Sequence, residues 1–573
     1  MRCPALLFPR SGAWLVHRAL LLFLLFSGTA WGQAAPDAGS LQQQLDRERT
    51  QTLPPRTAPF PEAAPPSTAP RTPATLTVTA FRFSGNRLLD SERLAPAVAA
   101  FLNRPIDYAQ LQQAVAAVGD TYRRAGWVVR VFLPAQEISS GEVTIQVVEA
   151  IYGGALPEGA PPRRVELAQV LSLLAAQQQP GQPLNADALD RGLLLADDLP
   201  GVSVAGSLQA GARNGQTDVA LRVEDEALAQ TDLVLDNSGA RSTGRARLGA
   251  NLGVNSPLGR GELIAINALH TAGSDYLRAS LSVPLGADGW RAGLNASHLG
   301  YHLVAPEFAA LNAKGSFDAA GLEASYPLIR SRLKNLYFNT ALDRKRFDNL
   351  SADAVTSRYR ASVLTLGLAG NLFDNLGGGG ANSASLALTV GTLDLAGSPN
   401  QGADTATTRA AGHYAKLRYG LTREQELGHQ FSLYAALSGQ WAAKNLDSSE
   451  KFYLGGAGGV RAYPNSEGGG AQASLLNLEL RRRLREGLRL AAFYDFGRVT
   501  VNRDNAFSGA TAVNTYSLKG AGLSLSWLSG RGSTLRGTWA RRIGANPAPA
   551  ANGNDQDGTL IKDRLWLAAG VSF

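Results

Sequence analysis

The alternation of apolar and polar residues divides the chain into two parts. Residues 75–225 combine helical periodicity with short strand patterns, whereas residues 226–573 alternate with a period of two. In residues 245–255 one face is polar and the other is apolar, the apolar face holding Ala246, Leu248, Ala250, Leu252 and Val254. The gaps between such segments are rich in Gly, Asn and Asp, which favour turns. The second part is therefore predicted to be a series of β-strands, each with one polar and one apolar face.

Two arrangements can bury or shield such strands. In a soluble sandwich or propeller the apolar faces meet in a core, whereas in an outer-membrane barrel they face lipid and the polar faces line a lumen. The barrel is favoured because the polar faces hold Arg, Lys and Asp rather than Ser and Thr alone, and because the chain ends on the aromatic Phe573. Counting strands backward from that residue predicts sixteen of them.

Residues 75–150 show the order strand, helix, helix, strand, strand. The second helix has the clearest signals, with a capping-box pattern at Asp107 and Gln110 and Gly126 at its end. Residues 151–225 repeat this order less regularly. There Asn185 is the predicted cap of a helix, and Asn214-Gly215 predicts a hairpin turn. The fold class expected is two tandem α+β modules, of β-α-α-β-β order, followed by a sixteen-stranded transmembrane antiparallel β-barrel.

The N-terminal residues 1–32 have the form of a secretory signal peptide. Basic residues end at Arg18, a short apolar run follows, and small residues precede an expected cleavage near Gly32. The run is shorter than the ~20 residues that a membrane-spanning helix needs, and an uncleaved anchor is the alternative. The only cysteine, Cys3, lies in this segment, so we expect no disulfide or thiol chemistry in the mature chain.

Two further segments lie between the signal peptide and the modules. Residues 33–52 predict a short polar helix with Ser40 as its cap, and Leu41 and Leu45 are its only apolar pair. Such a helix cannot form part of an ordinary core. Residues 53–74 are rich in proline and predict an extended linker.

Composition narrows the class of protein. The 573 residues are 45% hydrophobic and 18% charged with 62 Gly, which disfavours helical bundles and coiled coils. The net charge of +8 includes three Arg of the signal segment, so nucleic acid is not an expected partner. The six His show no metal-ligand spacing, and the sequence has neither a nucleophile elbow nor a phosphate loop. We therefore expect no enzymatic activity, no metal and no cofactor.

One loop and one strand of the barrel region hold the candidate functional residues. The loop follows a Gly-rich segment and places one cation between apolar and aromatic residues: Val460, Arg461, Ala462 and Tyr463. In residues 488–497 the alternation directs Phe493 and Asp495 into the lumen. A loop folded back into the barrel could pair Arg461 with Asp495 bidentately. On residue types alone, a solvated Arg461 and an ordinary polar lumen residue at Asp495 remain the alternative.

The order of these features resembles the transporter component of two-partner secretion, the ShlB/FhaC/HecB type. The resemblance spans the mature chain and rests on the polar helix, the Pro-rich linker, the two modules and four motifs: Leu133–Gly141, Asp236–Gly244, Val460–Tyr463 and Phe493–Gly497. It implies a sixteen-stranded outer-membrane barrel (226–573), periplasmic POTRA domains at 75–150 and 151–225, and a plug helix within 33–52.

The resemblance also implies roles for single residues. Arg461 on the loop pairs with Asp495 of the barrel wall, Val460, Ala462 and Tyr463 lie beside the Arg, and Phe493 and Gly497 complete the wall motif. Two positions depart from the family pattern. Ala462 stands where Gly is usual, which has a cost if φ is positive there, and the segment 470–473 lacks the Asp of the usual Gly-Asp-x-Gly element.

The implied function is the export, without ATP, of one large β-helical exoprotein of the adhesin or haemolysin type. The implied contact is the strand edge of the POTRA domains, which would bind the unfolded client by β-augmentation. Outer-membrane lipid and the barrel-assembly machinery that inserts the protein are the other expected partners. Two alternatives are an outer-membrane assembly insertase, which generally has more than two POTRA modules, and a passive porin, which needs none.

Overall fold

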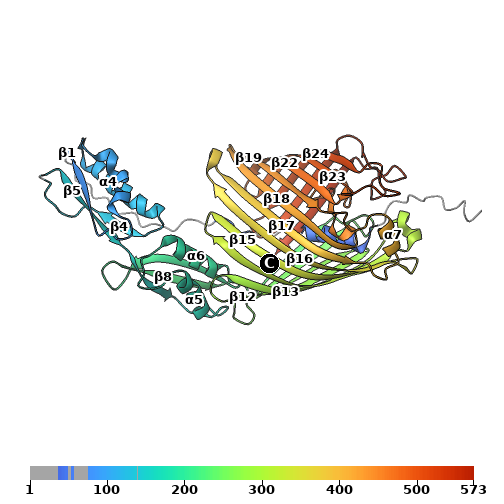
Figure 1. Cartoon of the computed structure of the whole chain (residues 1–573), viewed down its shortest axis with the longest axis horizontal. Coiled ribbons are helices and arrows are strands. Elements are labelled where there is room, and N and C mark those ends of the chain that lie inside the picture. The colour runs from blue at the N-terminus through green and yellow to red at the C-terminus, as the bar shows by residue number, and fades with distance from the viewer. Residues whose placement is uncertain (1–35, 49–52, 57–74, 139) are drawn as a thin grey trace, which may run out of the picture.

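The computed structural model describes residues 36–48, 53–56, 75–138 and 140–573. The predicted signal peptide (1–32) and most of the predicted linker lie outside the described residues. Figure 1 shows two small α+β modules, in blue and green, beside a large barrel of tilted strands. None of the helices in the described part is long and apolar enough to cross a membrane.

The first module is a three-stranded sheet covered by two helices. Its sheet has the order β2-β5-β4, with β2 parallel to β5. The cap predicted at Asp107 is present, since its carboxylate and the Gln110 side chain each accept from the other's backbone N–H. The elements are β1 (Leu76–Thr77), β2 (Ala80–Ser84), α3 (Ser91–Val98), η1 (Ala99–Phe101), β3 (Pro105–Ile106), α4 (Tyr108–Arg124), β4 (Val129–Phe132) and β5 (Glu142–Glu149).

The second module repeats this architecture. Asn185 caps α6 by accepting from the Ala188 N–H at 2.9 Å, and Gly215 forms the hairpin turn with a φ of 79°. Both features agree with the sequence prediction. The elements are β6 (Ile151–Glu158), α5 (Leu167–Gln177), α6 (Ala186–Asp197), β7 (Val202–Ala210) and β8 (Gln216–Asp225), and the sheet order is β6-β8-β7.

Sixteen antiparallel strands then close into a barrel, in which β9 pairs with both β10 and β26. The predicted fold class is confirmed. Exposed leucines alternate with inward polar residues, as lipid on one side and a lumen on the other require. The strands are β9 (Ala229–Asp236), β10 (Arg247–Asn255), β11 (Leu263–Thr271), β12 (Ser274–Leu285), β13 (Trp290–His302), β14 (Lys314–Arg330), β15 (Lys334–Ser351), β16 (Ala354–Asp374), β17 (Gly380–Asp394), β18 (Gly412–Gly428), β19 (Phe431–Ala442), β22 (Gln472–Arg485), β23 (Leu488–Thr500), β24 (Thr515–Leu528), β25 (Ser533–Arg542) and β26 (Asp563–Ser572).

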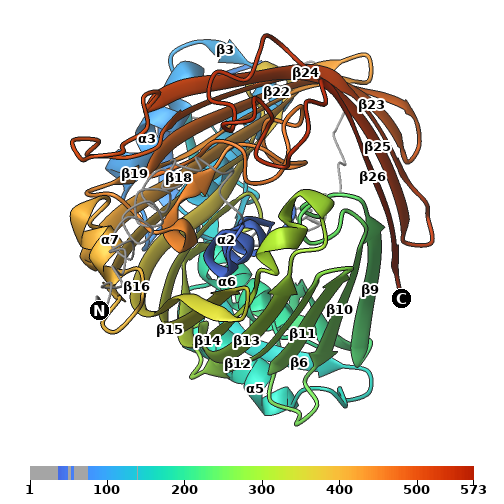
Figure 2. The same cartoon turned by 90° about the vertical axis from the view of Figure 1, so that its right-hand side faces the viewer.

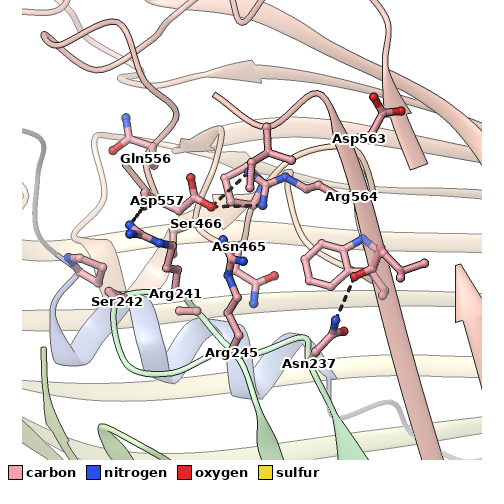
Figure 3. Close-up of a pocket in the computed structure, with 17 residues that line it drawn as sticks. Asn237, Arg241, Ser242, Arg245, Asn465, Ser466, Gln556, Asp557, Asp563 and Arg564 are labelled. Carbon is pink, nitrogen blue, oxygen red and sulfur yellow. Dashed lines mark hydrogen bonds and ion pairs between the residues drawn. The ribbon is translucent and has the colours of Figure 1, made fainter. Parts of the chain in front are cut away.

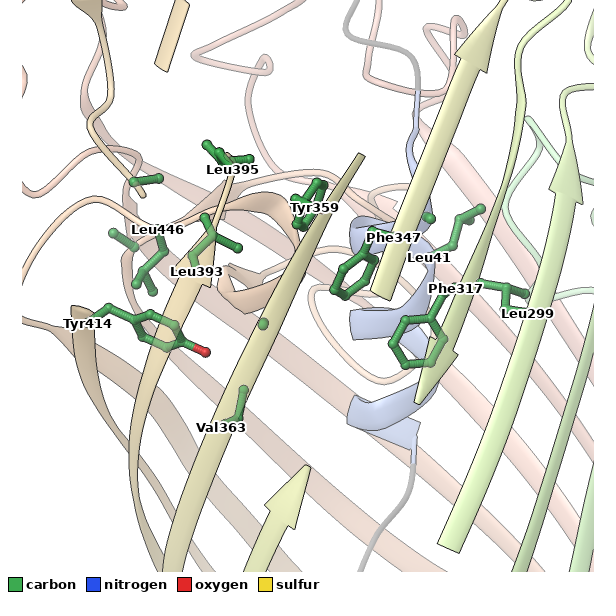
Figure 4. Packing of buried hydrophobic residues seen from close by; sticks show 14 of the residues in the cluster. Leu41, Leu299, Phe317, Phe347, Tyr359, Val363, Leu393, Leu395, Tyr414 and Leu446 are labelled. Carbon is green, nitrogen blue, oxygen red and sulfur yellow. The ribbon is translucent and has the colours of Figure 1, made fainter. Parts of the chain in front are cut away.

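The polar helix α2 (Ala38–Glu48) lies inside the barrel (Figure 2). Its first turn is capped by Asp37, which accepts from the Ser40 N–H at 2.8 Å, so the predicted cap at Ser40 is wrong. Asp is at least as good a cap as Ser, and its position three residues earlier lets the helix begin at Ala38. Leu41 packs into an apolar cluster at the wall with Phe317 and Phe347 (Figure 4).

Short helical segments occupy several connections. They are η2 (Pro306–Leu311), η3 (Leu376–Gly378), α7 (Gln401–Ala406) and η4 (Ser448–Glu450). The last of these lies in the long connection between β19 and β22, which also contains β20 (Phe452–Tyr453) and β21 (Gly469–Gly470).

Two ion pairs fix the second module to the end of the barrel at which β14 and β15 are joined. The Asp198 carboxylate, at the end of α6, accepts from Arg330 Nε at 2.8 Å and from Nη2 at 2.7 Å. A second pair joins Asp190 to Arg332 Nε at 2.6 Å. Burial raises the pKa of the Asp190 carboxyl, and the Arg332 guanidinium opposes that shift. Because Arg330 and Arg332 lie at the turn between β14 and β15, these pairs orient the module relative to the lumen.

Replacing Asp198 with Asn should loosen this junction. Arg330 is 4% exposed and would lose a bidentate charged partner, but Asp198 is about one third exposed, so we expect a cost of about 1–2 kcal/mol. Hydrogen exchange of α6 in the full-length protein is the measurement, and it should become faster. Asp187→Asn on the exposed face of the same helix is the matched control. Equal exchange in both variants would contradict a fixed junction.

Candidate functional site

The connection between β19 and β22, residues 443–471, folds back into the barrel, and we call it the inner loop. β19 ends at Ala442, on the side of the barrel remote from the modules, so the inner loop enters the lumen from that side. Several of its apolar residues are fully buried against the wall, among them Leu454, Val460 and Tyr463. The loop is therefore a packed part of the barrel interior.

Arg461 and Asp495 form a bidentate ion pair where the inner loop meets β23. Arg461 Nε donates to Asp495 Oδ2 at 2.9 Å, and Nη2 donates to Oδ1 at 2.7 Å. The backbone N–H of Arg461 also donates to Oδ2, at 3.0 Å. Asp495 is fully buried and Arg461 is 9% exposed. Three hydrogen bonds to one buried carboxylate fix both the side chain and the backbone of the loop at this point.

Three neighbours that the sequence analysis missed complete this pair. Glu479 accepts from Arg461 Nη1 at 2.7 Å, and Asn477 donates to Asp495 Oδ1 at 2.7 Å. Both lie on β22, at positions paired in register with Phe493 and Asp495 of β23. The indole of Trp566 on β26 donates to the Arg461 carbonyl at 2.8 Å. The alternation along residues 472–485 already indicates that Asn477 and Glu479 face the lumen. Which side chains they contact, however, depends on the strand register.

The remaining wall residues shape the surface that receives the loop. The Arg461 guanidinium lies over the Phe493 ring, 3.5 Å from its centroid, which is a cation–π contact. A Cβ on Gly497 would lie 2.8 Å from Leu454 Cδ2 and 3.0 Å from Val460 Cγ2. Gly at position 497 is thus required for the loop to approach the wall this closely.

The two departures from the family pattern fit into this structure. Ala462 has no positive φ, so its Cβ causes no backbone strain. That Cβ faces Gly520 on β24, where an added Cβ would lie only 2.7 Å away. Ala471 is fully buried, and its carbonyl accepts from the Gln440 side chain at 3.1 Å. Beside the Arg461 pair, Tyr463 is also fully buried and stacks under the Arg542 guanidinium, 4.4 Å from the ring centroid.

Helix α2 contacts the inner loop mainly through polar groups. Arg47 donates to the carbonyls of Tyr453 at 2.5 Å and Gly458 at 2.8 Å. At the other end of the helix, the Ser448 hydroxyl donates to Asp37 at 2.7 Å. The helix therefore sits on the loop, and the loop in turn is fixed to the wall.

A buried cluster of charges holds the η4 part of the inner loop. The Glu450 carboxylate forms ion pairs with Lys345 Nζ of β15 at 3.2 Å and with Lys416 Nζ of β18 at 2.5 Å. The side chains of Glu450 and Lys416 are each 3% exposed. The inner loop is thus bound on two sides of the barrel, by Glu450 at β15 and β18 and by Arg461 at β23.

Two cavities lie next to this assembly. A lumen cavity of about 1050 Å³ is lined by α2, by the inner loop and by wall residues that include Arg461 and Glu479. A smaller cavity of about 220 Å³ lies where β26 meets the connection between β9 and β10 (Figure 3). There the Asn237 side chain donates to the Leu565 carbonyl at 2.9 Å and continues the pairing beyond the last β9 residue.

The described residues contain no group of three or more His, Cys, Asp or Glu side chains that could hold a metal ion. The charged residues of the site are instead paired with each other, Arg461 with Asp495 and Glu479. This arrangement can hold a loop in place.

Comparison with known proteins places the chain in a family. The profile described as "Haemolysin secretion/activation protein ShlB/FhaC/HecB" matches residues 215–526, and the profile "POTRA domain, ShlB-type" matches residues 76–150. The chain is 25% identical to the heme/hemopexin transporter protein HuxB of Haemophilus influenzae over 97% of this chain and 98% of that protein. It is 24% identical to the outer membrane transporter CdiB of Escherichia coli over 89% of this chain and 87% of that protein.

Solved structures support the same fold. CdiB from Escherichia coli superposes with a TM-score of 0.70 at 21% identity, covering 95% of this chain and all of that chain. CdiB from Acinetobacter baumannii gives 0.61 at 15% identity, covering 98% of each chain. Since the first profile alone covers more than half of the sequence, the chain belongs to the ShlB/FhaC/HecB family of haemolysin secretion/activation proteins, the outer-membrane transporters of two-partner secretion.

Proposed function

We propose that this protein binds an unfolded exoprotein of the adhesin or haemolysin type in the periplasm and moves it through the barrel lumen without ATP. The observation that supports this most is the way the lumen is occupied. Helix α2 is held there by hydrogen bonds of Arg47 to the inner loop, by the ion pair of Glu48 with Arg247 of β10 at 2.8 Å, by hydrogen bonds to Asn349 and Arg418 of the wall, and by an apolar contact at Leu41. Such contacts can be broken one at a time, unlike the continuous pairing of a strand.

The client-binding step uses the edges of the POTRA sheets. In the sheet orders β2-β5-β4 and β6-β8-β7 the outer strands each leave one edge without a partner in that sheet. An extended client can add to such an edge through main-chain hydrogen bonds, which tolerate varied sequences. The names of the relatives, a heme/hemopexin transporter and outer membrane transporters, are consistent with an exported cargo.

The residues at the site take distinct roles in this proposal. Arg461 and Asp495 hold the inner loop to the wall, and Val460, Ala462 and Tyr463 pack the loop around them. Phe493 and Gly497 form the wall surface. During export α2 leaves the lumen, whereas the inner loop stays attached to β23. The cavity beside α2 is then joined with the space that the helix occupied, and the loop remains as part of the lining of the lumen. Outer-membrane lipid and the barrel-assembly machinery are proposed partners for insertion.

Deleting the gene in the native host should remove one large exoprotein from the culture medium. Comparison of the medium and outer-membrane proteomes with and without the gene measures this and needs no guess about the client. Broad depletion of outer-membrane barrels would instead indicate an insertase. No change in either fraction would favour a passive porin.

Arg461→Asp and Asp495→Arg should each reduce export at least about tenfold. Each leaves a buried charge without its partner, which typically costs about 3–5 kcal/mol. The exchanged pair Arg461→Asp with Asp495→Arg should recover part of the activity. Because Glu479 would repel an Asp at position 461, the test is made in an E479Q background. The measurement is the amount of client in the medium.

The variant E479Q alone is the matched control, and it should keep most of the export because Asp495 still holds Arg461. Heat-modifiable migration on gels establishes that each barrel has folded. An exchanged pair that exports no more than either single variant would argue against a direct bond between the two residues.

A further inference from the structure

Four arginines lie together on the outer face of the barrel, remote from the POTRA domains. They occupy neighbouring strands that Figure 1 shows on the near side of the barrel. Along β15 and β16 even-numbered residues face outward and are in part exposed, and odd-numbered residues face the lumen. The exposed arginines in the outer half of these strands are Arg344, Arg346, Arg358 and Arg360.

These arginines stand at the rim of the apolar band. On β16 the exposed residues below Arg360 include Leu364, Leu366, Leu368 and Leu372. The eleven residues from position 362 to 372, ten steps along the strand, span about 25 Å in a strand tilted by about 40°, which matches the apolar band of an outer-membrane barrel. On β15 the exposed Leu342 directly precedes Arg344 on the same face. The guanidinium groups are thus level with the head groups of the outer leaflet.

Carboxylates on the same surface balance these charges only in part. Asp348 pairs with Arg346 at 2.9 Å and also with Arg358. Asp318 pairs with His298 at 2.7 Å. Arg360 stands directly opposite Arg346 in the strand register, and Asp394 stands opposite Arg360 on its other side. Among the described residues neither Arg344 nor Arg360 has a carboxylate within ion-pair distance.

Two like charges directly opposite each other destabilise a sheet unless a counter-charge lies between them. Asp318 stands opposite Arg346 on the β14 side, as Asp394 stands opposite Arg360 on the β17 side, so these two arginines are flanked by carboxylates. Arg344 stands between Ala320 and Ser362 and has no carboxylate opposite it, so the unbalanced positive charge lies at Arg344 and favours an anion there. Guanidinium groups bind phosphate bidentately, and several of them can surround one phosphate group.

An apolar hollow adjoins the cations. A cavity of about 600 Å³ on the outer surface is lined by Leu277, Ala279, Ala296 and Ala320, by the paired side chains of His298 and Asp318 and, at its border, by Arg344, Arg346 and Arg360. The three alanines and Arg344 lie in one row, since Ala279 pairs with Ala296, Ala296 with Ala320, and Ala320 with Arg344. A ligand that fits this site has an anionic head and an apolar tail.

We propose that this surface is a binding site for a phosphorylated glycolipid of the outer leaflet, of the lipid A type. A phosphate of the head group lies between Arg344, Arg346 and Arg360, and an acyl chain lies in the hollow formed by the alanines. The inner face of the same strands presents Lys345, Phe347 and Tyr359 to the inner loop and α2. The bound lipid therefore stabilises the part of the wall on which α2 rests.

The test uses the full-length protein purified in detergent, with added lipid A, phosphatidylethanolamine or inorganic phosphate. Native mass spectrometry measures bound lipid, and thermal unfolding measures its effect. Lipid A should bind and raise the unfolding temperature, whereas the other two additives should not. The variant R344Q/R360Q should bind lipid A about tenfold more weakly, as expected for the loss of two charged contacts.

Two controls separate this site from general charge effects. Arg541→Gln removes an exposed cation at the same end of β25, where Arg541 faces Asp563, and Lys334→Gln removes one at the opposite end of β15. Both should bind lipid A as the wild type does. If R344Q/R360Q does not fold, R344K/R360K keeps the charge without the bidentate geometry and should bind with intermediate strength.

Three results would overturn the proposal. They are equal loss of lipid A in R541Q, equal binding of phosphatidylethanolamine, and stabilisation by inorganic phosphate alone, which would indicate a site for free anions.

Discussion

The structure depends on one buried ion pair between a loop and the wall that surrounds it. Arg461 has three hydrogen bonds to Asp495 and a fourth to Glu479, and the Phe493 ring lies beneath its guanidinium. A buried charge is costly unless it is paired and fully hydrogen-bonded, so this set of contacts strongly favours one position of the loop. The loop approaches the wall so closely at Gly497 that a side chain at residue 497 would prevent the loop from taking this position.

The position of helix α2 depends on the inner loop and on the barrel wall, to which Glu48 is joined by its ion pair with Arg247 at 2.8 Å. Arg47 contacts loop carbonyls, and these would be displaced if the loop left the wall. The helix is polar on most of its surface, which is unusual for a buried segment but suits a lumen lined with charged residues. A helix held by polar contacts can be exchanged for another polar, extended chain at a modest cost in free energy. In the function proposed above, this exchange is the step that opens the lumen to the client.

Much of the fold could be predicted because period-two alternation and caps are local signals. The sixteen strands follow from alternation, and the caps at Asp107 and Asn185 follow from residue type. The helix cap at Ser40 was wrong because Asp37 competes for the same role three residues away. The alternation of polar and apolar residues predicted that Asp495 faces the lumen. The contacts of Asn477 with Asp495 and of Glu479 with Arg461 depend on the strand register, which one sequence does not reveal. The domain limits and the roles of the site residues stay predictions.

In the proposed function α2 leaves the lumen during export while the inner loop stays attached to the wall. Gln44 of α2 donates to the Ser466 hydroxyl of the inner loop, and the only cysteine of the chain is Cys3 in the predicted signal segment. The most direct measurement is therefore client export after a short thiol crosslinker has joined Gln44→Cys to Ser466→Cys. Export should stop in the crosslinked protein and continue in each treated single-cysteine variant. Undiminished export by fully crosslinked protein would contradict it.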